Sequence, residues 1–385
     1  MNIKIYPSKI SGVINAPPSK SITHRAIIAA ALAHGTSVIK NVLFSDDTKY
    51  TIHALQQLGV EIEQNKTTLT IYGTGGKLIA PKKPLYVGNS GSTLRMITAI
   101  ASLAKGETII TGEKRLQKRP IQDLLDALKQ INTSIITIDG SKSSQYITAL
   151  LLIAPFAKNT LEIIIKGDLR SKPYVLLTLD VMKSFGVSFH LRGGNLLTPL
   201  EKNQKYKGRK YTVEGDFSSA AYFFAAAAIT KGKITVKNLN KNSAQGDKNF
   251  LNLLQKIGST VDMNDYPDIV QTLAVVAAFT KGKTTITNIN HLKDKETNRI
   301  SATAKELRKM GIAVKATNDK LIIQGGIPKG AVINTYNDHR MAMSFAVAGL
   351  AAMGETIIQN AEVVNKSYPN FWKDLQNLGA KIEVI

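Results

Sequence analysis

Residues 21–62 read SITHRAIIAAALAHGTSVIKNVLFSDDTKYTIHALQQLGVEI, and this stretch decides the fold class. It begins with an Ala-rich segment that is apolar nearly all round, which is typical of a buried helix. A run of alternating β-branched residues follows, and then an amphipathic helical pattern that ends at Leu58-Gly59. A second β-rich run closes the stretch, so it predicts one α/β unit whose first helix lies in the interior.

The same unit recurs through the chain. A β-rich run and an amphipathic helix occupy residues 35–62, 106–130, 161–189, 232–261, 282–314 and 354–385. An Ala-rich apolar segment precedes or opens each of them, at residues 21–35, 90–106, 143–159, 217–232, 266–282 and 337–354. Six units in 385 residues divide into two lobes of three units each, with the cleft between lobes as the expected ligand site.

The apolar segments open on small, polar or charged residues. Ordinary N-capping by Ser, Asp and Asn explains each opening taken alone. Capping does not call for the cations near these openings, namely Lys20, Arg25, Arg119 and Arg340. Because helix N-termini present free N–H groups and a positive dipole end, we expect the openings to converge on an anionic ligand.

The net charge of +22, from 50 Lys and Arg against 28 Asp and Glu, also indicates an anionic partner, although a lysine-rich solvated surface explains much of it. Nucleic-acid binding would place basic clusters among aromatic residues, and no such cluster occurs. Arginine suits the bidentate recognition of carboxylate and phosphate. Five of the ten arginines lie in the motifs below: Arg25, Arg95, Arg119, Arg299 and Arg340.

The absence of cysteine excludes disulfides, thiolate metal sites and a cysteine nucleophile. The first residues carry no apolar signal region, and the most apolar run, near residues 225–229, is too short to span a bilayer. We therefore expect a cytoplasmic protein, a monomer without nucleic-acid or membrane partners.

The motifs along the chain resemble those of the 5-enolpyruvylshikimate-3-phosphate synthases. They are PSKSITHR at 18–25, GNSGSTLR at 88–95, Arg119-Pro120, SSQ at 143–145, SKPY at 171–174, YPD at 266–268, KETNR at 295–299, NDHR at 337–340 and Lys366. Their order and approximate spacing match over almost the whole chain.

The resemblance implies an α/β fold of the enolpyruvyl transferase type, a two-lobed inside-out α/β barrel of six repeated units. The lobes would be residues 18–208, on the shikimate 3-phosphate side, and residues 1–17 with 209–385, which carry the acid–base pair. It also implies a 3-phosphoshikimate 1-carboxyvinyltransferase of the shikimate pathway, which leads to chorismate and the aromatic amino acids. Such an enzyme transfers the enolpyruvyl group of phosphoenolpyruvate to the 5-hydroxyl of shikimate 3-phosphate by addition and elimination. It is a target of glyphosate and uses no cofactor or metal.

The resemblance assigns three sets of residues. Catalysis falls to Asp268, Glu296 and Lys20. Shikimate 3-phosphate is held by Lys20, Ser21, Arg25, Ser143, Ser144, Gln145, Ser171, Tyr174, Asp268, His291 and Lys295. Phosphoenolpyruvate is held by Lys20, Gly91, Arg119, Gln145, Arg299, Arg340 and Lys366. We expect neighbouring cations to keep Asp268 ionised as the base for the substrate hydroxyl, while Glu296 serves C3.

Two features depart from the family pattern. His291 stands where Asn is usual, and the chain is too short for a strand pair at residues 130–141 and again at 260–266. Three alternatives therefore stay open. They are the sister transferase that acts on UDP-N-acetylglucosamine, a basic nucleic-acid-binding protein built on related repeats, and a non-catalytic member of the family.

Overall fold

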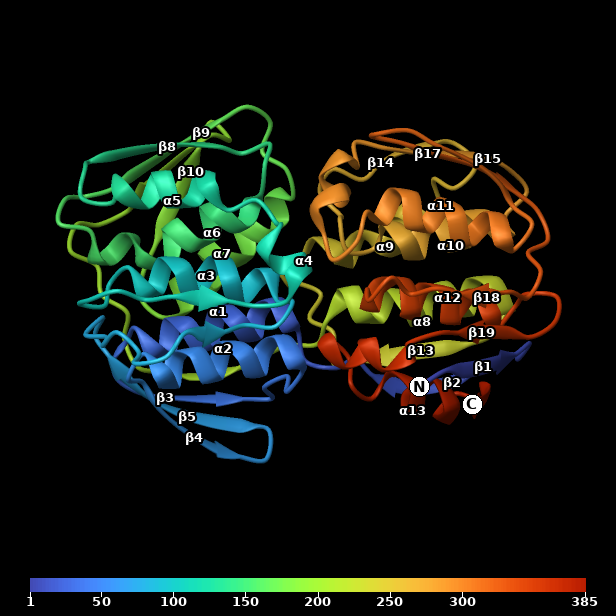
Figure 1. The fold of residues 1–385 in the computed structure, drawn as a ribbon, viewed down its shortest axis with the longest axis horizontal. Coiled ribbons are helices and arrows are strands. Elements are labelled where there is room, and N and C mark those ends of the chain that lie inside the picture. Colours follow the sequence, from blue (N-terminus) through green and yellow to red (C-terminus); the bar gives the residue numbers. More distant parts are fainter. The chain divides into compact units, whose positions relative to one another are not determined.

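A computed structural model describes all residues, 1–385, and shows a mixed α/β protein (Figure 1). Contacts divide the chain into two compact units: a contiguous unit, Pro18–Glu214, and a split unit, Met1–Pro17 with Gly215–Ile385. The sequence placed the second boundary after residue 208, and the structure corrects it. Residues 209–214 stay with the contiguous unit because β12 (Lys210–Thr212) pairs in parallel with β3 (His34–Lys40).

The six Ala-rich segments form buried helices, as predicted. They are α1 (Lys20–Ala31), α3 (Gly91–Ala101), α6 (Ser144–Ile153), α8 (Phe217–Thr230), α10 (Val270–Phe279) and α12 (His339–Gly349). In α12 every residue is buried, and in α1 every residue from Ile22 onward is. In each unit these helices lie inside and the sheets lie outside (Figure 1).

Each buried helix is followed by a strand, a second helix and another strand. In the contiguous unit these are β3, α2 (Asp46–Gln57) and β4 (Glu61–Asn65); β7 (Ile110–Thr111), α5 (Gln122–Lys129) and β8 (Ile135–Asp139); and β9 (Glu162–Lys166), α7 (Lys172–Ser184) and β10 (Phe189–Arg192). In the split unit they are β13 (Ile234–Lys237), α9 (Phe250–Leu254) and β14 (Thr260–Asp262); β15 (Gly282–Thr287), α11 (Arg299–Lys309) and β16 (Ala313–Ala316); and β19 (Thr356–Ile358), α13 (Phe371–Asn377) and β20 (Lys381–Val384).

The last strand of four repeats has an antiparallel partner. These pairs are β4 with β5 (Thr68–Thr74), β10 with β11 (Leu196–Pro199), β16 with β17 (Leu321–Gly325), and β20 with the N-terminal strand β1 (Ile3–Tyr6). In the other two repeats, β8 and β14 stand alone after their helices and pair in parallel with β9 and β15. These are the two places where the sequence is too short for a strand pair.

The strands form six separate open sheets rather than a closed barrel. Four sheets have four strands, in the orders β18-β19-β1-β20, β10-β11-β9-β8, β12-β3-β5-β4 and β14-β15-β17-β16. The remaining strands, β2 (Gly12–Asn15), β6 (Leu85–Tyr86) and β18 (Val332–Ile333), pair in parallel with β13, β7 and β19. None of the helices is long and apolar enough to cross a lipid bilayer.

Candidate active site

Arg25 ties three helices of the contiguous unit together. Its side chain is 2% exposed and donates to the Thr178 hydroxyl at 2.8 Å, the Thr148 hydroxyl at 3.3 Å and the carbonyls of Ser21 and Tyr174 at 2.8 and 3.2 Å. All four acceptors are neutral. Burial lowers the pKa of Arg25 to about 10, since no carboxylate offsets the lost hydration. An anionic ligand would supply the missing counter-charge.

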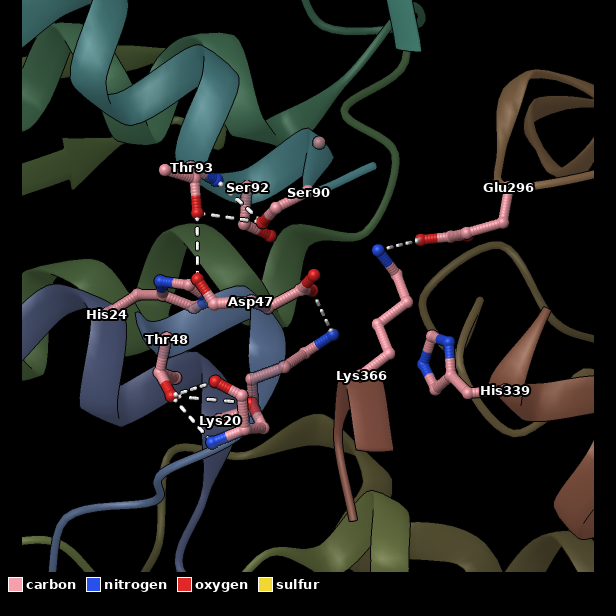
Figure 2. Close-up of polar contacts among 12 residues, drawn as sticks. Lys20, His24, Asp47, Thr48, Ser90, Ser92, Thr93, Glu296, His339 and Lys366 are labelled. Carbon is pink, nitrogen blue, oxygen red and sulfur yellow. Dashed lines mark hydrogen bonds and ion pairs between the residues drawn. The ribbon is translucent and has the colours of Figure 1, made fainter. Parts of the chain in front are cut away.

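Lys20 starts α1, with Ser19 as the N-cap. Its Nζ lies 3.0 Å from Oδ2 of Asp47 on α2, and the two side chains are 11% and 3% exposed (Figure 2). A chain of hydroxyls holds Asp47 in place. Thr93 donates to the Asp47 carbonyl at 3.0 Å and contacts Thr51 at 2.8 Å.

The N-terminus of α3 lies beside Arg119, which follows α4 (Lys114–Gln117) and is buried. A Cβ at Gly91 would be 2.4 Å from Nη1 of Arg119, so a side chain at this position would displace the guanidinium from its present place. Gln145 at the start of α6 donates to Ser92 at 3.1 Å and accepts from Arg95 at 2.9 Å. The structure thus brings three predicted phosphoenolpyruvate residues of the contiguous unit, Gly91, Arg119 and Gln145, to neighbouring helix starts.

In the split unit, Arg299 contacts three carboxylates. Its side chain is 2% exposed and lies 2.8 Å from Asp338, 2.9 Å from Glu296 and 3.2 Å from Asp268. Burial by itself would lower the pKa of Arg299, but the three carboxylates outweigh burial and raise it. Arg299 therefore stays charged and fixes the geometry of both predicted acid–base residues.

Two further cations complete this cluster. Arg340 Nη2 lies 3.2 Å from Asp268, and its Nη1 donates to the Tyr222 hydroxyl at 3.2 Å. Lys366, at the end of the 3-10 helix η4 (Ala361–Lys366), lies 3.9 Å from Glu296 (Figure 2). Three buried cations and three carboxylates nearly neutralise one another, so an entering phosphate would compete with the protein's own carboxylates for these cations.

Asp247 lies in the same unit, in the 3-10 helix η2 (Gly246–Asn249), and accepts a short hydrogen bond from the Ser218 hydroxyl. Burial, reinforced by the charge of Asp268, raises the pKa of Asp247 to about 7. The carboxyl is therefore protonated in a large part of the molecules near neutral pH.

The other predicted residues take less central places. Ser143 caps α6 by accepting from the Gln145 amide at 3.2 Å, and Ser144 is buried at its first turn. Ser171 caps α7 in a left-handed conformation, φ 54°, with Tyr174 one turn on. His291 lies in the 3-10 helix η3 (Asn290–Asp294), with Lys295 next after it, and both are half-buried. Asp268 precedes α10 by two residues rather than opening it.

Sequence reasoning assigned no role to three acidic residues, Asp47, Asp338 and Asp247. Each is at most 3% exposed. Asp338 was visible as part of the NDHR motif and Asp247 as an acid beside a buried helix. Their side-chain partners Lys20, Arg299 and Ser218, however, lie at least 27 residues away in the sequence, so no local pattern predicts these pairs.

Comparisons with known proteins show the family of the chain. A family model described as EPSP synthase (3-phosphoshikimate 1-carboxyvinyltransferase) matches residues 5–137, 132–265 and 258–375. The 3-phosphoshikimate 1-carboxyvinyltransferase of Methanocaldococcus jannaschii is 42% identical, over 98% of this chain and 97% of the relative. That of Methanococcus aeolicus is 40% identical, over 98% of both chains. A solved structure of EPSP synthase from Acinetobacter baumannii superposes with a TM-score of 0.81 at 26% identity, over 100% of both chains.

The fold is that of an enolpyruvyl transferase. The chain belongs to the EPSP synthase family, so it is a transferase of the shikimate pathway.

Proposed function

We propose that this chain transfers the enolpyruvyl group of phosphoenolpyruvate to the 5-hydroxyl of shikimate 3-phosphate and releases phosphate. The observation that carries the proposal is the cluster in the split unit, where Arg299, Arg340 and Lys366 contact Asp268 and Glu296. Cations and acid–base groups in direct contact suit a reaction that adds a hydroxyl to an anionic enol phosphate and expels phosphate. The family supplies the identity of both substrates.

The proposed reaction moves protons in both the addition and the elimination. The substrate hydroxyl adds to C2 of phosphoenolpyruvate while C3 gains a proton, and a tetrahedral ketal forms. C3 then loses a proton as phosphate leaves. Asp268, held between Arg299 and Arg340, is the proposed base for the hydroxyl. Glu296, between Arg299 and Lys366, is proposed to serve C3, and Lys20 or Lys366 to donate to the departing phosphate.

The proposed binding sets follow the units. The split unit contributes Arg299, Arg340 and Lys366 to phosphoenolpyruvate. The contiguous unit contributes Lys20, Gly91, Arg119 and Gln145. For shikimate 3-phosphate, the neutral surroundings of buried Arg25 are the main support. Further contributions to shikimate 3-phosphate binding stay predictions for Ser21, Ser143, Ser144, Ser171, Tyr174, His291 and Lys295. The same holds for a monomeric state, a cytoplasmic location and the lack of cofactor, metal, membrane and nucleic-acid partners.

The test measures phosphate release with shikimate 3-phosphate or UDP-N-acetylglucosamine as acceptor. Only the first should support turnover.

Arg119→Ala and Arg340→Ala should raise KM for phosphoenolpyruvate and lower kcat, since each removes charge-assisted hydrogen bonds worth about 1.5–3 kcal/mol. Arg192→Ala, which alters an exposed arginine on β10, is the control.

Turnover of UDP-N-acetylglucosamine would replace the proposal by the sister activity. No turnover of either acceptor, with a folded protein, would favour the non-catalytic member. Unchanged kinetics in Arg119→Ala and Arg340→Ala would remove the assignment of the binding set.

A further inference from the structure

The turn that leads into α12 has an unusual backbone. Tyr336 and Asn337, directly before Asp338, are both left-handed, with φ of 51° and 55°. Asparagine visits this region readily, but a bulky aromatic residue does so only when its surroundings impose it. Such strain clusters at functional sites, and the turn here ends at the residue that caps the helix of Arg340.

Glu306 on α11 contacts this turn, which a bond from the Tyr336 amide to the Asn334 side chain at 2.7 Å also closes. It is fully buried, and both of its carboxylate oxygens face the turn. Oε1 accepts from the Tyr336 hydroxyl at 2.6 Å, and Oε2 accepts from the Asn334 amide at 3.1 Å. Lys309 lies 2.7 Å from Oε2 and offsets the charge. Burial, together with the hydrogen bond to Glu306, raises the pKa of Tyr336, so the hydroxyl keeps the proton that it donates.

This turn contacts two segments that carry cations, the start of α12 with Arg340 and the start of η4, which ends at Lys366. On one side, the Asp338 amide donates to the Thr335 carbonyl at 2.9 Å, and the Asp338 carboxylate accepts from the Arg340 amide at 2.8 Å. On the other side, Asn337 accepts from the Asn360 side chain at 3.3 Å. Asn360 is the left-handed N-cap of η4, the helix that ends at Lys366.

We propose that Glu306 and Tyr336 are positioning residues for phosphoenolpyruvate, because they hold the turn at 334–337 that sets Arg340 and Lys366. The proposal rests on the proposed assignment of these two cations to that substrate. Neither Glu306 nor Tyr336 touches the substrate. The Glu306 carboxylate and the Tyr336 hydroxyl form hydrogen bonds within the strained turn and not with the surrounding core. A purely structural role at a fully buried helix position would be met by an apolar side chain.

Steady-state kinetics with both substrates tests the proposal. Tyr336→Phe removes only the hydroxyl, and it should raise KM for phosphoenolpyruvate about 3- to 10-fold, which is the range of one hydrogen bond. KM for shikimate 3-phosphate should stay within about twofold. Tyr6→Phe is the matched control, because Tyr6 donates to Glu383 at 2.9 Å in the same unit at an exposed site. It should change neither constant.

Conservative replacement separates positioning from simple loss of stability. Glu306→Gln keeps an amide oxygen for the Tyr336 hydroxyl, so its KM for phosphoenolpyruvate should fall between those of the wild type and Glu306→Ala. Should the Glu306 variants fail to fold, Asn337→Gly serves instead. Glycine adopts the left-handed conformation without strain but lacks the contact with Asn360, and it too should raise KM for phosphoenolpyruvate.

Unchanged KM for phosphoenolpyruvate in Tyr336→Phe and Asn337→Gly, or an equal rise in both Michaelis constants, would overturn the positioning role. Arg340→Ala and Lys366→Ala distinguish this failure from that of the site itself. If they raise KM for phosphoenolpyruvate while Tyr336→Phe does not, only the positioning role is wrong. If they leave it unchanged, the assignment of the cations and the positioning role fail together.

Discussion

Arg25 is a buried cation that the protein leaves without a carboxylate partner among its acceptors. A buried charge of this kind costs stability, so replacing it by an apolar side chain of similar length is often neutral or stabilising. The neighbouring hydroxyls would not be stranded, because Thr148 and Thr178 contact each other at 2.9 Å and Thr178 donates to the Tyr174 carbonyl at 2.8 Å. Arg25 is therefore expected to favour ligand binding while lowering the stability of the ligand-free protein.

Arg25→Met should weaken the binding of shikimate 3-phosphate about 10- to 150-fold, which corresponds to the loss of a charge-assisted hydrogen bond. Its melting temperature without ligand should equal or exceed that of the wild type. Calorimetric titration and thermal unfolding measure the two effects. A variant that melts lower and binds normally would show that Arg25 is a structural residue.

Asp268 and Glu296 share Arg299 but differ in their second cation, Arg340 for Asp268 and Lys366 for Glu296. Asp268→Asn and Glu296→Gln should each lower kcat about 10²- to 10⁴-fold, as the loss of a general acid or base does. Glu296→Gln should slow hydrogen exchange into C3 of phosphoenolpyruvate more than Asp268→Asn does, relative to turnover. Glu383→Gln, on an exposed strand, is the control. Wild-type turnover in both variants would contradict the mechanism.

At the scale of elements, the buried start of α8 and the helix η2 enclose the carboxyl of Asp247. Asp247 meets Ser218, and the charges nearest to it are Asp268, Arg340 and Asp216. Because its folded-state pKa of about 7 exceeds the usual value of 3.8, the unfolded chain releases this proton first as pH rises. Stability from this group is therefore complete below pH of about 4 and is lost toward pH of about 7.

Asp247→Asn removes this titration and keeps the shape of the side chain. Relative to the variant, the wild type should lose stability as pH rises from 5 to 8, by up to about 1.4 kcal/mol per pH unit within the titration range. Urea unfolding of both proteins at the two pH values measures the difference, in which the titration of other groups largely cancels. An identical difference at pH 5 and pH 8 would mean that Asp247 is already ionised in the folded protein.

The element scale also shows what sequence could predict. The Ala-rich pattern of α10 or α12 has one interpretation, because a helix that is apolar all round must be buried. The sequence likewise placed Lys20, Arg25 and Arg340 near the openings of buried helices, and they lie within the first six residues of α1 and α12. The prediction of the unit boundary failed because the sequence pattern near residue 210 is weak. The three residues of β12 carry no strand pattern of their own, and their pairing with β3 moved the unit boundary from 208 to 214.

The sequence also could not predict which distant side chains pair with each other. Glu306 reads as a surface acid in the exposed-looking pattern AKELRK, yet it is fully buried under the turn at 334–337. Nothing near it in sequence distinguishes it from Glu355, which is exposed beside Lys4. Burial of a charged residue depends on where the chain returns, 30 residues later, and local periodicity contains no such information.

At the scale of the whole molecule, the charge of +22 divides into two populations. The lysines at 202, 205, 207 and 210 are exposed and belong to the solvated surface. By contrast, the four arginines assigned to substrate, Arg25, Arg119, Arg299 and Arg340, are all buried. Net charge alone therefore could not identify the ligand, whereas the location of the arginines in the motifs could.

The division into units also predicts how parts of the chain fold. The contiguous unit needs nothing outside residues 18–214 to complete its sheets. The split unit has its own core, in which Ile3, Ile5, Ile10 and Ile14 pack with residues from 221 onward. Residues 215–385 alone would lack β1, which lies between β19 and β20 in its sheet, and the core residues that the N-terminal segment supplies.

We therefore expect residues 18–214, produced alone, to unfold cooperatively in urea, and residues 215–385 alone to remain unfolded. Joining residues 1–17 to residue 215 through a short glycine linker should restore folding, since the Pro17 carbonyl already accepts from the Asp216 amide at 2.8 Å. Circular dichroism during urea titration measures all three proteins. The isolated contiguous unit should also bind shikimate 3-phosphate, more weakly than the full chain, through Arg25, and Arg25→Met should weaken that binding by the same factor as in the full chain. A fragment 18–214 that stays unfolded would show that the two units depend on each other for stability.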